Sequence, residues 1–297
     1  MKNLLTPVLI LLSIAIIAGA ITYANRTSTE TVAEESVAKE PKLEHVHGFS
    51  VDVSNENRLL IATHHGLMQF LDNKLSKIGA VSDDLMGFTP HPTDPSVYFS
   101  SGHPTRGGSL GFQKSSDGGT TWQKVSDGIN GPVDFHSMAI STVDPDLIYG
   151  HFGSLQHSKD GGKTWQVAKG SVQPYSLSTD PKREGIIYAA SANGVLMSED
   201  NGDSWKSYSS GLDNGAVSTF AVSPDASYAL AFSQVLGGLG KTTNNGITWS
   251  KISESFGGSA ILFISYSKTN PLIAYSMTQA NDIFKSSDGG ATWIKLK

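Results

Sequence analysis

The 297-residue sequence contains no cysteine and only four arginines. Without cysteine the chain forms no disulfide and carries no lipid-modified cysteine, so its folded part must rely on packing alone. The net charge is −5, and no basic patch is visible along the chain. This balance argues against nucleic acid as a partner, because phosphate binding needs clustered Lys and Arg. No segment after residue 44 has a helical period, which leaves strands as the main expected element.

The first 24 residues are predicted to lie outside the globular fold. Lys2 precedes an apolar run over residues 4–24, which is about long enough for a helix that spans a bilayer. Ala18-Gly19-Ala20 is also a passable cleavage site for a secretory signal peptide. We therefore expect an N-terminal apolar helix that is either a signal peptide or a membrane anchor, and the length of the run favours the anchor. Either way the rest of the chain is expected to be extracytoplasmic, held at the membrane or secreted.

Residues 25–44 have the composition of a flexible spacer. They include five Glu and almost no large apolar side chain. Such a segment cannot bury enough apolar surface to fold. The remaining residues 45–297 are long enough to bury a complete core and are expected to form one domain.

All five tryptophans close copies of one eight-residue pattern, Ser/Thr-x-Asp-x-Gly-x-Thr/Ser-Trp. The copies end at Trp122, Trp165, Trp205, Trp249 and Trp293, which lie 43, 40, 44 and 44 residues apart. The fourth copy has Asn244 in the Asp position. A fixed period in the forties indicates a repeat architecture, and each repeat has the length of one four-stranded propeller blade.

The pattern also has a local physical logic. Asp and Asn side chains accept hydrogen bonds from backbone N–H groups two residues on, Gly supplies a positive φ, and Trp offers a large apolar ring to the next unit. The pattern resembles the Asp-box (BNR) repeat of sialidases, sortilin-type receptors, photosystem II assembly propellers and xyloglucan-cleaving hydrolases. It also resembles exported bacterial proteins labelled glycosyl hydrolase-like. The resemblance implies a β-propeller whose boxes are structural and lie on the face opposite the binding site.

Six repeats fit residues 45–297, one more than the boxes. Their inner-strand cores begin at His47, Met86, His136, Tyr175, Ser218 and Ile261. Each core is followed by a second apolar strand, a third strand, a turn and a fourth strand, with turn residues between the runs. The first repeat has Asp72-Asn73-Lys74 where a box would sit, as atypical terminal repeats often do. The sequence therefore predicts an all-β, six-bladed β-propeller of four-stranded blades, closed without a strand shared between the termini.

The histidines are confined to the first three repeats. All nine fall between residues 45 and 157, and seven of them lie on inner strands or at the ends of second strands. Alternate residues of a strand share a face, and an inner strand begins where the second strand ends. These side chains are therefore expected to converge at one mouth of the central channel. The candidate metal ligands are His45, His47, His64, His65, Met86, His103, His136 and His151.

Imidazole suits Zn²⁺ and Cu²⁺, and a thioether would favour Cu(I). Asp84 and Asp134 are expected as carboxylates that orient the imidazoles. The alternative is that these histidines only bond to backbone and water in a polar channel. His91, in a turn on the opposite face, and His157, beside a box, are expected to be structural.

An enzymatic function is weighed against binding. Sialidases use three arginines on the substrate carboxylate, and Arg58, Arg106 and Arg183 are the only ones in this domain. Two of them are expected to face away from the mouth, which disfavours sialidase activity. Another glycoside hydrolase would need two carboxylates, for which Asp84 and Asp134 are the only candidates. We expect a binding module whose mouth takes a metal (Cu or Zn), a small ligand or a protein. The alternatives are a glycoside hydrolase-like enzyme and a protein-binding assembly scaffold.

Overall fold

The structure is a computed structural model that describes residues 41–297. The predicted apolar helix and nearly all of the predicted spacer lie outside these residues. Within residues 41–297, no helix is long and apolar enough to cross a membrane. The described part contains 24 strands in six four-stranded antiparallel sheets, with two short 3-10 helices, η1 (Ser210–Leu212) and η2 (Phe256–Gly258). The predicted all-β, six-bladed propeller is confirmed.

Each sheet is one blade, and its strands follow the chain from the channel outward. The first three blades are β1 (Val46–Val51), β2 (Leu59–Thr63), β3 (Gly66–Leu71) and β4 (Lys74–Ile78); β5 (Asp84–Pro90), β6 (Tyr98–His103), β7 (Phe112–Ser115) and β8 (Gln123–Ser126); and β9 (Ser137–Ile140), β10 (Ile148–Phe152), β11 (Ser154–Ser158) and β12 (Gln166–Val167). The last three are β13 (Ser176–Thr179), β14 (Ile187–Ser191), β15 (Gly194–Ser198) and β16 (Lys206–Ser207); β17 (Val217–Val222), β18 (Ala229–Ser233), β19 (Gly238–Thr242) and β20 (Ser250–Lys251); and β21 (Ile261–Tyr266), β22 (Ala274–Thr278), β23 (Ile283–Ser286) and β24 (Ile294–Lys295).

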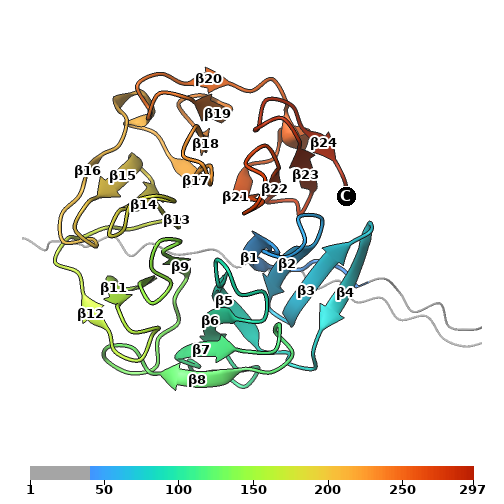
Figure 1. Cartoon of the computed structure of the whole chain (residues 1–297), viewed down its shortest axis with the longest axis vertical. Coiled ribbons are helices and arrows are strands. Elements are labelled where there is room, and N and C mark those ends of the chain that lie inside the picture. The colour runs from blue at the N-terminus through green and yellow to red at the C-terminus, as the bar shows by residue number, and fades with distance from the viewer. Residues whose placement is uncertain (1–40) are drawn as a thin grey trace, which may run out of the picture. The chain divides into compact units, whose positions relative to one another are not determined.

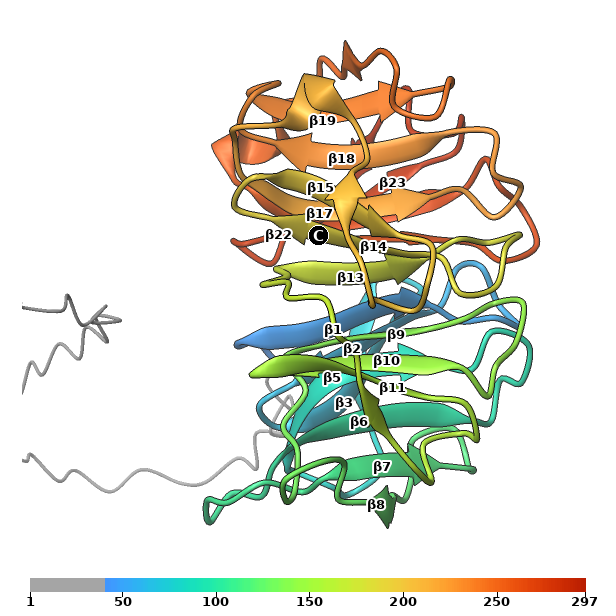
Figure 2. The ribbon, with the colours of Figure 1, turned by 90° about the vertical axis from the view of Figure 1, so that its left-hand side faces the viewer.

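The blades are arranged in a ring, with the inner strands around a central opening (Figure 1). The strands run across the ring from one face to the other (Figure 2). The ring closes where β21 of the last blade lies beside β1 of the first. No strand is shared at this closure, as predicted, because the chain starts on an inner strand and ends on an outer one. Hydrogen bonds join the two blades instead: Val51 N–H donates to Ser265 Oγ over 3.0 Å, and Tyr275 OH donates to the Glu56 carbonyl over 2.9 Å.

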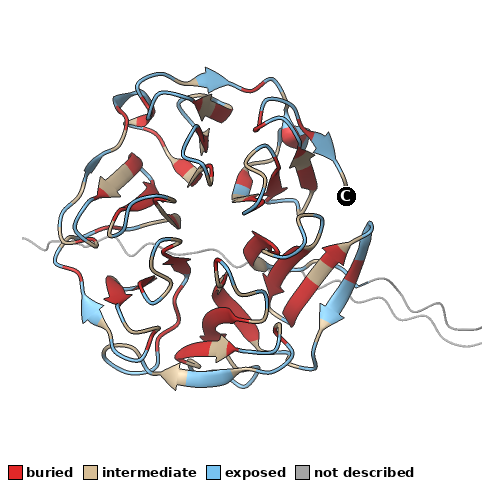
Figure 3. Cartoon of the chain, in the orientation of Figure 1, coloured by how far each residue is buried: buried red, intermediate tan, exposed pale blue. Residues whose placement is uncertain are grey.

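The hydrophobic core is divided among the blade boundaries. Six clusters of buried apolar side chains lie one at each boundary between neighbouring blades. Buried residues accordingly concentrate on the inner three strands, while the outermost strands are largely exposed (Figure 3). Each blade buries its apolar faces only against its neighbours, so the ring is stable as a unit and not blade by blade.

The Asp-box turns connect third and fourth strands, and the second copy shows how they are built. The Ser158 hydroxyl donates to Asp160 Oδ1 over 2.8 Å and accepts from Gly162 N–H over 2.8 Å. The Asp160 carboxylate also accepts from the backbone N–H and the hydroxyl of Thr164, over 2.9 and 2.7 Å. Gly162 has φ +85°, and a Cβ there would lie 1.9 Å from the ring of Phe112 in the preceding blade. Only glycine therefore fits this position.

The box tryptophans occupy equivalent positions at the blade boundaries. Trp165 Nε1–H donates to Ser126 Oγ of the preceding blade over 2.9 Å, and Trp249 Nε1–H donates to Ser209 Oγ over 3.0 Å. Trp293 is 6% exposed, whereas the other four are half-buried. The expected contact with the neighbouring blade is confirmed, but only Trp293 is fully buried.

The first blade replaces the box by a two-residue turn. Asp72 and Asn73 both have positive φ, 51° and 60°. Two consecutive residues with positive φ form the tight hairpin turn that suits twisted strands. The Asp-box turns lie on the face of the ring where the second strands begin. This placement follows from two hydrogen bonds to the turns that lead into β6 and β10: Gly118 N–H donates to the Ser96 carbonyl, and Gly161 N–H donates to the Asp146 carbonyl. The opposite face is therefore the one where inner strands begin.

Candidate metal centre at the channel mouth

The inner strands of all six blades line a central cavity of about 610 Å³. Its lining includes His47, His136 and Tyr175 near the end where inner strands begin. The other end of the channel carries Lys268. The candidate metal ligands gather at the end where the inner strands begin, which we call the mouth.

Three elements bring candidate ligands together at the mouth. β1 begins, β2 ends and β5 begins there, because neighbouring strands of a blade are antiparallel. His47 lies on β1, His64 follows the last residue of β2, and Asp84 is the first residue of β5 in the next blade. These side chains meet across the boundary between the first two blades.

His47, His64 and Asp84 form a compact group. One nitrogen from each imidazole and one carboxylate oxygen all lie within 4.8 Å of one another. His64 Nδ1 is 2.5 Å from Asp84 Oδ2, and His47 Nε2 is 3.5 Å from Asp84 Oδ1. The two rings meet edge to face, with centroids 4.5 Å apart. Because Zn²⁺ holds its ligands at about 2.0–2.2 Å, side-chain movements below about 1 Å would close this group around an ion.

Burial governs the charge of this group. Asp84 is 7% exposed, so a carboxylate there needs a cation or a hydrogen-bond donor close by. Desolvation lowers the pKa of His47, and the neighbouring histidines add to this effect, while Asp84 opposes it. Among the described residues, His47 Nε2 and Asp84 Oδ1 have no hydrogen-bond partner. A neutral imidazole beside an unpaired carboxylate oxygen is what metal binding requires.

A second group lies at the next blade boundary. Asp134 is 2% exposed and stands just before β9. Its Oδ2 atom is 3.0 Å from His103 Nε2 and 2.9 Å from His136 Nε2. The hydrogen bond to Asp134 raises the pKa of His136, against the opposite effect of desolvation.

Two predicted ligands lie at the edge of the first group. His45 is exposed and has φ 47°, and its ring centroid is 4.8 Å from that of His64. His65 is exposed in the turn between β2 and β3, where its backbone N–H donates to Thr63 Oγ1 over 3.1 Å. The structure brings His45 close to the group, and it does not bring His65 into it.

Two further predicted ligands are buried on strands near the second group. Met86 is 7% exposed on β5. His151 is 9% exposed on β10, and its backbone carbonyl accepts from His136 N–H over 3.2 Å. Desolvation lowers the pKa of His151, while a hydrogen bond with the Val172 backbone opposes this. His151 Nε2 has no hydrogen-bond partner in the described part of the chain.

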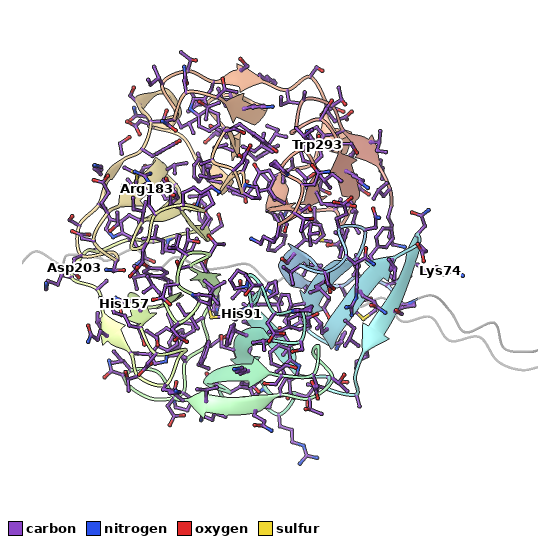
Figure 4. The ribbon with its side chains drawn as sticks, in the orientation of Figure 1. Lys74, His91, His157, Arg183, Asp203 and Trp293 are labelled. Atoms are coloured by element: carbon purple, nitrogen blue, oxygen red, sulfur yellow. The ribbon has the colours of Figure 1, made fainter. Side chains whose placement is uncertain are left out.

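The two histidines expected to be structural lie away from the mouth. His91 Nδ1 accepts from the backbone N–H of Asp94 over 3.0 Å, in the turn between β5 and β6 on the box face. His157 is 7% exposed on β11, and Figure 4 shows it out in the third blade, away from the central opening. The pKa of each is lowered by desolvation.

The arginines do not form a sialidase clamp. Arg58 Nη1 is 2.9 Å from Asp52 Oδ2, and Arg183 Nη2 is 2.7 Å from Asp180 Oδ2. Both ion pairs stand in turns between first and second strands, on the box face, as expected; Figure 4 labels Arg183.

Two features of these groups were not visible in the sequence. Asp84 was expected to orient an imidazole or to act as an acid, but it lies within the group of ligand atoms itself. The insertion after His103 also has an unexpected role, because the Gly108 carbonyl lies 3.3 Å from His103 Nδ1. One sequence feature could have indicated the position of Asp84. It lies two residues before Met86 on an inner strand, so the two side chains share a face, and this strand begins where a second strand ends in a histidine.

Comparison with known proteins agrees with the repeat pattern. The family model described as BNR/Asp-box repeat matches residues 156–167, which span the second box. This chain is a six-bladed β-propeller that carries the Asp-box repeat. No curated protein sequence matches the chain.

Several solved structures share the propeller fold. The GH74 enzyme of Niastella koreensis superposes with a TM-score of 0.61 at 17% identity, covering 85% of this chain and 46% of the enzyme. The GH74 xyloglucanase of Xanthomonas campestris gives 0.59 at 16% identity, with 85% and 45% covered. YCF48 bound to a D1 peptide gives 0.55 at 16% identity, with 86% and 83% covered. The chain thus spans less than half of each of these two GH74 enzymes, and at these identities the likeness concerns the fold alone.

Proposed function

We propose that this Asp-box propeller is a binding module that holds a transition-metal ion at its channel mouth. The observation that carries the proposal is the group of His47, His64 and Asp84, whose three ligand atoms lie within 4.8 Å of one another. Two imidazoles and one carboxylate leave a coordination position open for water or a bound ligand.

The donor set favours particular ions. Imidazole and carboxylate suit Zn²⁺ and Cu²⁺, whereas Cu(I) prefers thioether or thiolate. The lowered pKa of His47 supports metal binding, since a neutral imidazole is available at neutral pH without proton release. The competing explanation is a proton: His64 Nδ1 and Asp84 Oδ2, 2.5 Å apart, also suit a protonated imidazole paired with a carboxylate.

The test is metal binding by the full-length chain after chelator treatment. We expect Zn²⁺ and Cu²⁺ to bind and to raise the melting temperature, because an ion that binds only the native state stabilises it by mass action. The double variant His47→Ala/His64→Ala should lose this metal-dependent shift. The matched control is His91→Asn, which removes an imidazole on the opposite face and keeps a side-chain acceptor for the Asp94 N–H. No binding of either ion, or equal binding in the double variant, would refute the proposal.

We also propose that residues 1–24 export the chain and anchor it in the cell membrane. Their apolar run supports this reading, since about 20 apolar residues span a bilayer. Cell fractionation and the mass of the mature N-terminus test it. Recovery of the intact chain with membranes supports an anchor, and a shortened, released chain supports a signal peptide. Recovery of the intact chain in the cytosol would contradict both.

A second candidate function is peptide binding at the same mouth. Exposed apolar side chains at strand ends on this side support it: Phe152, Tyr175, Val235 and Leu262. Exposed apolar groups on one face mark interaction sites, and YCF48, which shares the fold, was solved with a D1 peptide. Peptides selected on the full-length chain should lose affinity with Tyr175→Ser and keep it with Ile294→Ser, an exposed apolar residue on an outer strand. Equal affinity in both variants would show that the peptides do not bind at the mouth.

A further inference from the structure

We propose that the mouth binds a second transition-metal ion, held by His103, Asp134 and His136 at the boundary between the second and third blades. This inference rests on the proposed function, because it assigns a second site of the same kind. The probe ions are Zn²⁺ and Cu²⁺.

The second group repeats the construction of the first, one blade further round the ring. In each case a histidine at the end of a second strand reaches an aspartate at the start of the next blade. His64 Nδ1 is 2.5 Å from Asp84 Oδ2, and His103 Nε2 is 3.0 Å from Asp134 Oδ2. Strand register supports the equivalence, since β1 and β5 pair with their second strands at Val51–Leu59 and Pro90–Tyr98. Two equivalent positions in a repeat protein place equivalent side chains in equivalent surroundings.

The second group differs from the first in its third member. Met86 follows Asp84 by two residues at the start of β5, as His47 follows His45 by two residues at the start of β1. The second imidazole comes from the third blade, where His136 stands two residues after Asp134 and its Nε2 is 2.9 Å from Asp134 Oδ2. The group therefore again offers two imidazoles and one carboxylate, although its ligand atoms are more widely spread than those of the first group, which among the described residues is the one with three ligand atoms within 4.8 Å.

Among the described residues, Asp134 has one carboxylate oxygen without a partner, while the other is hydrogen-bonded to His136 over 2.9 Å. The residue is 2% exposed, and its Oδ1 atom has no hydrogen-bond partner in the described part of the protein. Both imidazole nitrogens approach the other oxygen, Oδ2. A buried carboxylate with one oxygen unpaired is costly unless a cation or donor completes it.

His103 is held in the orientation that a metal ligand requires. Its Nδ1 atom lies 3.3 Å from the Gly108 carbonyl oxygen, which can only accept a hydrogen bond. Nδ1 must therefore carry a proton, and in a neutral ring Nε2 then presents a lone pair toward Asp134. A neutral ring would place two lone pairs 3.0 Å apart, so this contact needs either a proton on Nε2 or a metal ion between the two atoms. A backbone carbonyl on the far nitrogen is also the usual outer contact of a metal-bound histidine.

The insertion that supplies Gly108 is fixed to the second blade. Leu110 N–H donates to the Gly102 carbonyl over 2.7 Å, and Gly107 N–H donates to the Pro104 carbonyl over 3.0 Å. The longer second repeat thus folds back over the strand end and positions His103. This gives the insertion, which the other repeats lack, a definite role in the second site.

The two groups are neighbours. Asp84 begins β5, which lies beside β9 of the next blade, and His47 and His136 line the same central cavity. Two bound ions would therefore lie close enough for their charges to interact. Asp84 and Asp134 supply the negative charge that offsets this repulsion.

The experiment measures the number of ions bound by the full-length chain. Chelator-treated protein is loaded with Zn²⁺, freed of excess ion by gel filtration and analysed for metal content. The variants are His64→Ala for the first site and His103→Ala/His136→Ala for the second, with His91→Asn as the control. The second-site imidazoles are largely exposed, 42% and 65%, so their removal should leave the fold intact. Loading with Cu²⁺ adds a spectroscopic readout, because two nearby Cu²⁺ ions broaden each other's electron paramagnetic resonance.

We expect two ions in the unaltered chain and in the control, and one in each site variant, with loss of the broadening in both. One ion in the unaltered chain that only His64→Ala removes would overturn the second site and leave the proposed function standing. One ion lost in either variant would mean a single shared site and would also overturn this inference. No ion in any form would refute the proposed function itself.

Discussion

His64 and Asp84 face each other across the boundary of the first two blades, with Nδ1 of the imidazole 2.5 Å from Oδ2 of the carboxylate. The two residues are 20 positions apart in sequence and belong to different sheets. Their contact joins the end of one second strand to the beginning of the next inner strand. An ion bound here would therefore connect two blades, and its binding should raise the free energy of unfolding of the whole ring.

The first prediction concerns Asp84→Asn. The variant keeps the shape of the side chain and removes the anionic ligand. We expect its affinity for Zn²⁺ to fall by at least about 100-fold, since loss of an outer-shell partner alone costs about 10–100-fold. At an ion concentration 100 times the dissociation constant of the unaltered chain, the stabilisation of about 2.7 kcal/mol should largely disappear. Thermal unfolding with and without Zn²⁺ measures this effect.

Asp83→Asn is the matched control for this prediction. It makes the same change of charge at the preceding residue, outside β5 and outside the group of ligand atoms. We expect its Zn²⁺-dependent shift to equal that of the unaltered chain. An equal shift in Asp84→Asn would show that the carboxylate is not a ligand.

The fold could be predicted from the sequence because its signals are local and repeated. Each box forms its bonds within five residues, as from Ser158 to Gly162, so five tryptophans suffice to set the period. The degree of burial of each tryptophan was less predictable. Trp293 is buried against Phe256 of η2, with ring centroids 5.6 Å apart, and this short helix has no signal of its own in the strand pattern.

The candidate site was predicted only in part, because it is built between repeats. Strand alternation placed His47 and the strand-end histidines at one mouth. It could not show that His64 and His103 each reach the aspartate of the following blade, since that contact depends on the rotation from blade to blade. It also could not separate His64 from His65, because only the turn geometry decides that His65 faces solvent.

The second prediction concerns hydrolase activity. Asp84 and Asp134 are 7% and 2% exposed, and both already face imidazoles. Glycoside hydrolysis needs two carboxyl groups on either side of an accessible glycosidic bond. We expect no release of reducing sugar from xyloglucan by the full-length chain, assayed beside an active GH74 enzyme. Hydrolysis that disappears in both Asp84→Asn and Asp134→Asn would establish the enzyme alternative.

The third prediction concerns Trp293→Ala. Because this side chain is 6% exposed and packs between the last two blades, its removal should lower the free energy of unfolding by about 3–5 kcal/mol. Trp122→Ala should lower the free energy of unfolding by less, because Trp122 is only half-buried. Ile294→Ala, at the neighbouring residue that is 61% exposed, should change stability by less than about 0.5 kcal/mol. Urea denaturation of the three variants compares them, and equal losses for the two tryptophans would contradict the burial difference.

The last prediction concerns the pH dependence of the boxes. Hydrogen bonds from the Thr164 hydroxyl and N–H, and from Ser158, lower the pKa of Asp160 to about 2. A carboxyl group in the unfolded chain titrates near about 3.9. Since the folded pKa is the lower one, the stabilisation from Asp160 is complete above the unfolded value and is lost as the pH falls through the folded value.

The fourth box has Asn244 instead, whose Oδ1 accepts from Thr248 N–H over 3.0 Å while its amide donates to the Thr248 hydroxyl. We therefore expect Asn244→Asp to stabilise the propeller at pH 7, with a gain that shrinks between about pH 4 and pH 2, and Asp160→Asn to show the reverse. Urea denaturation at several pH values measures both differences, and a difference that does not change over this range would show that the carboxylate charge contributes nothing to the turn.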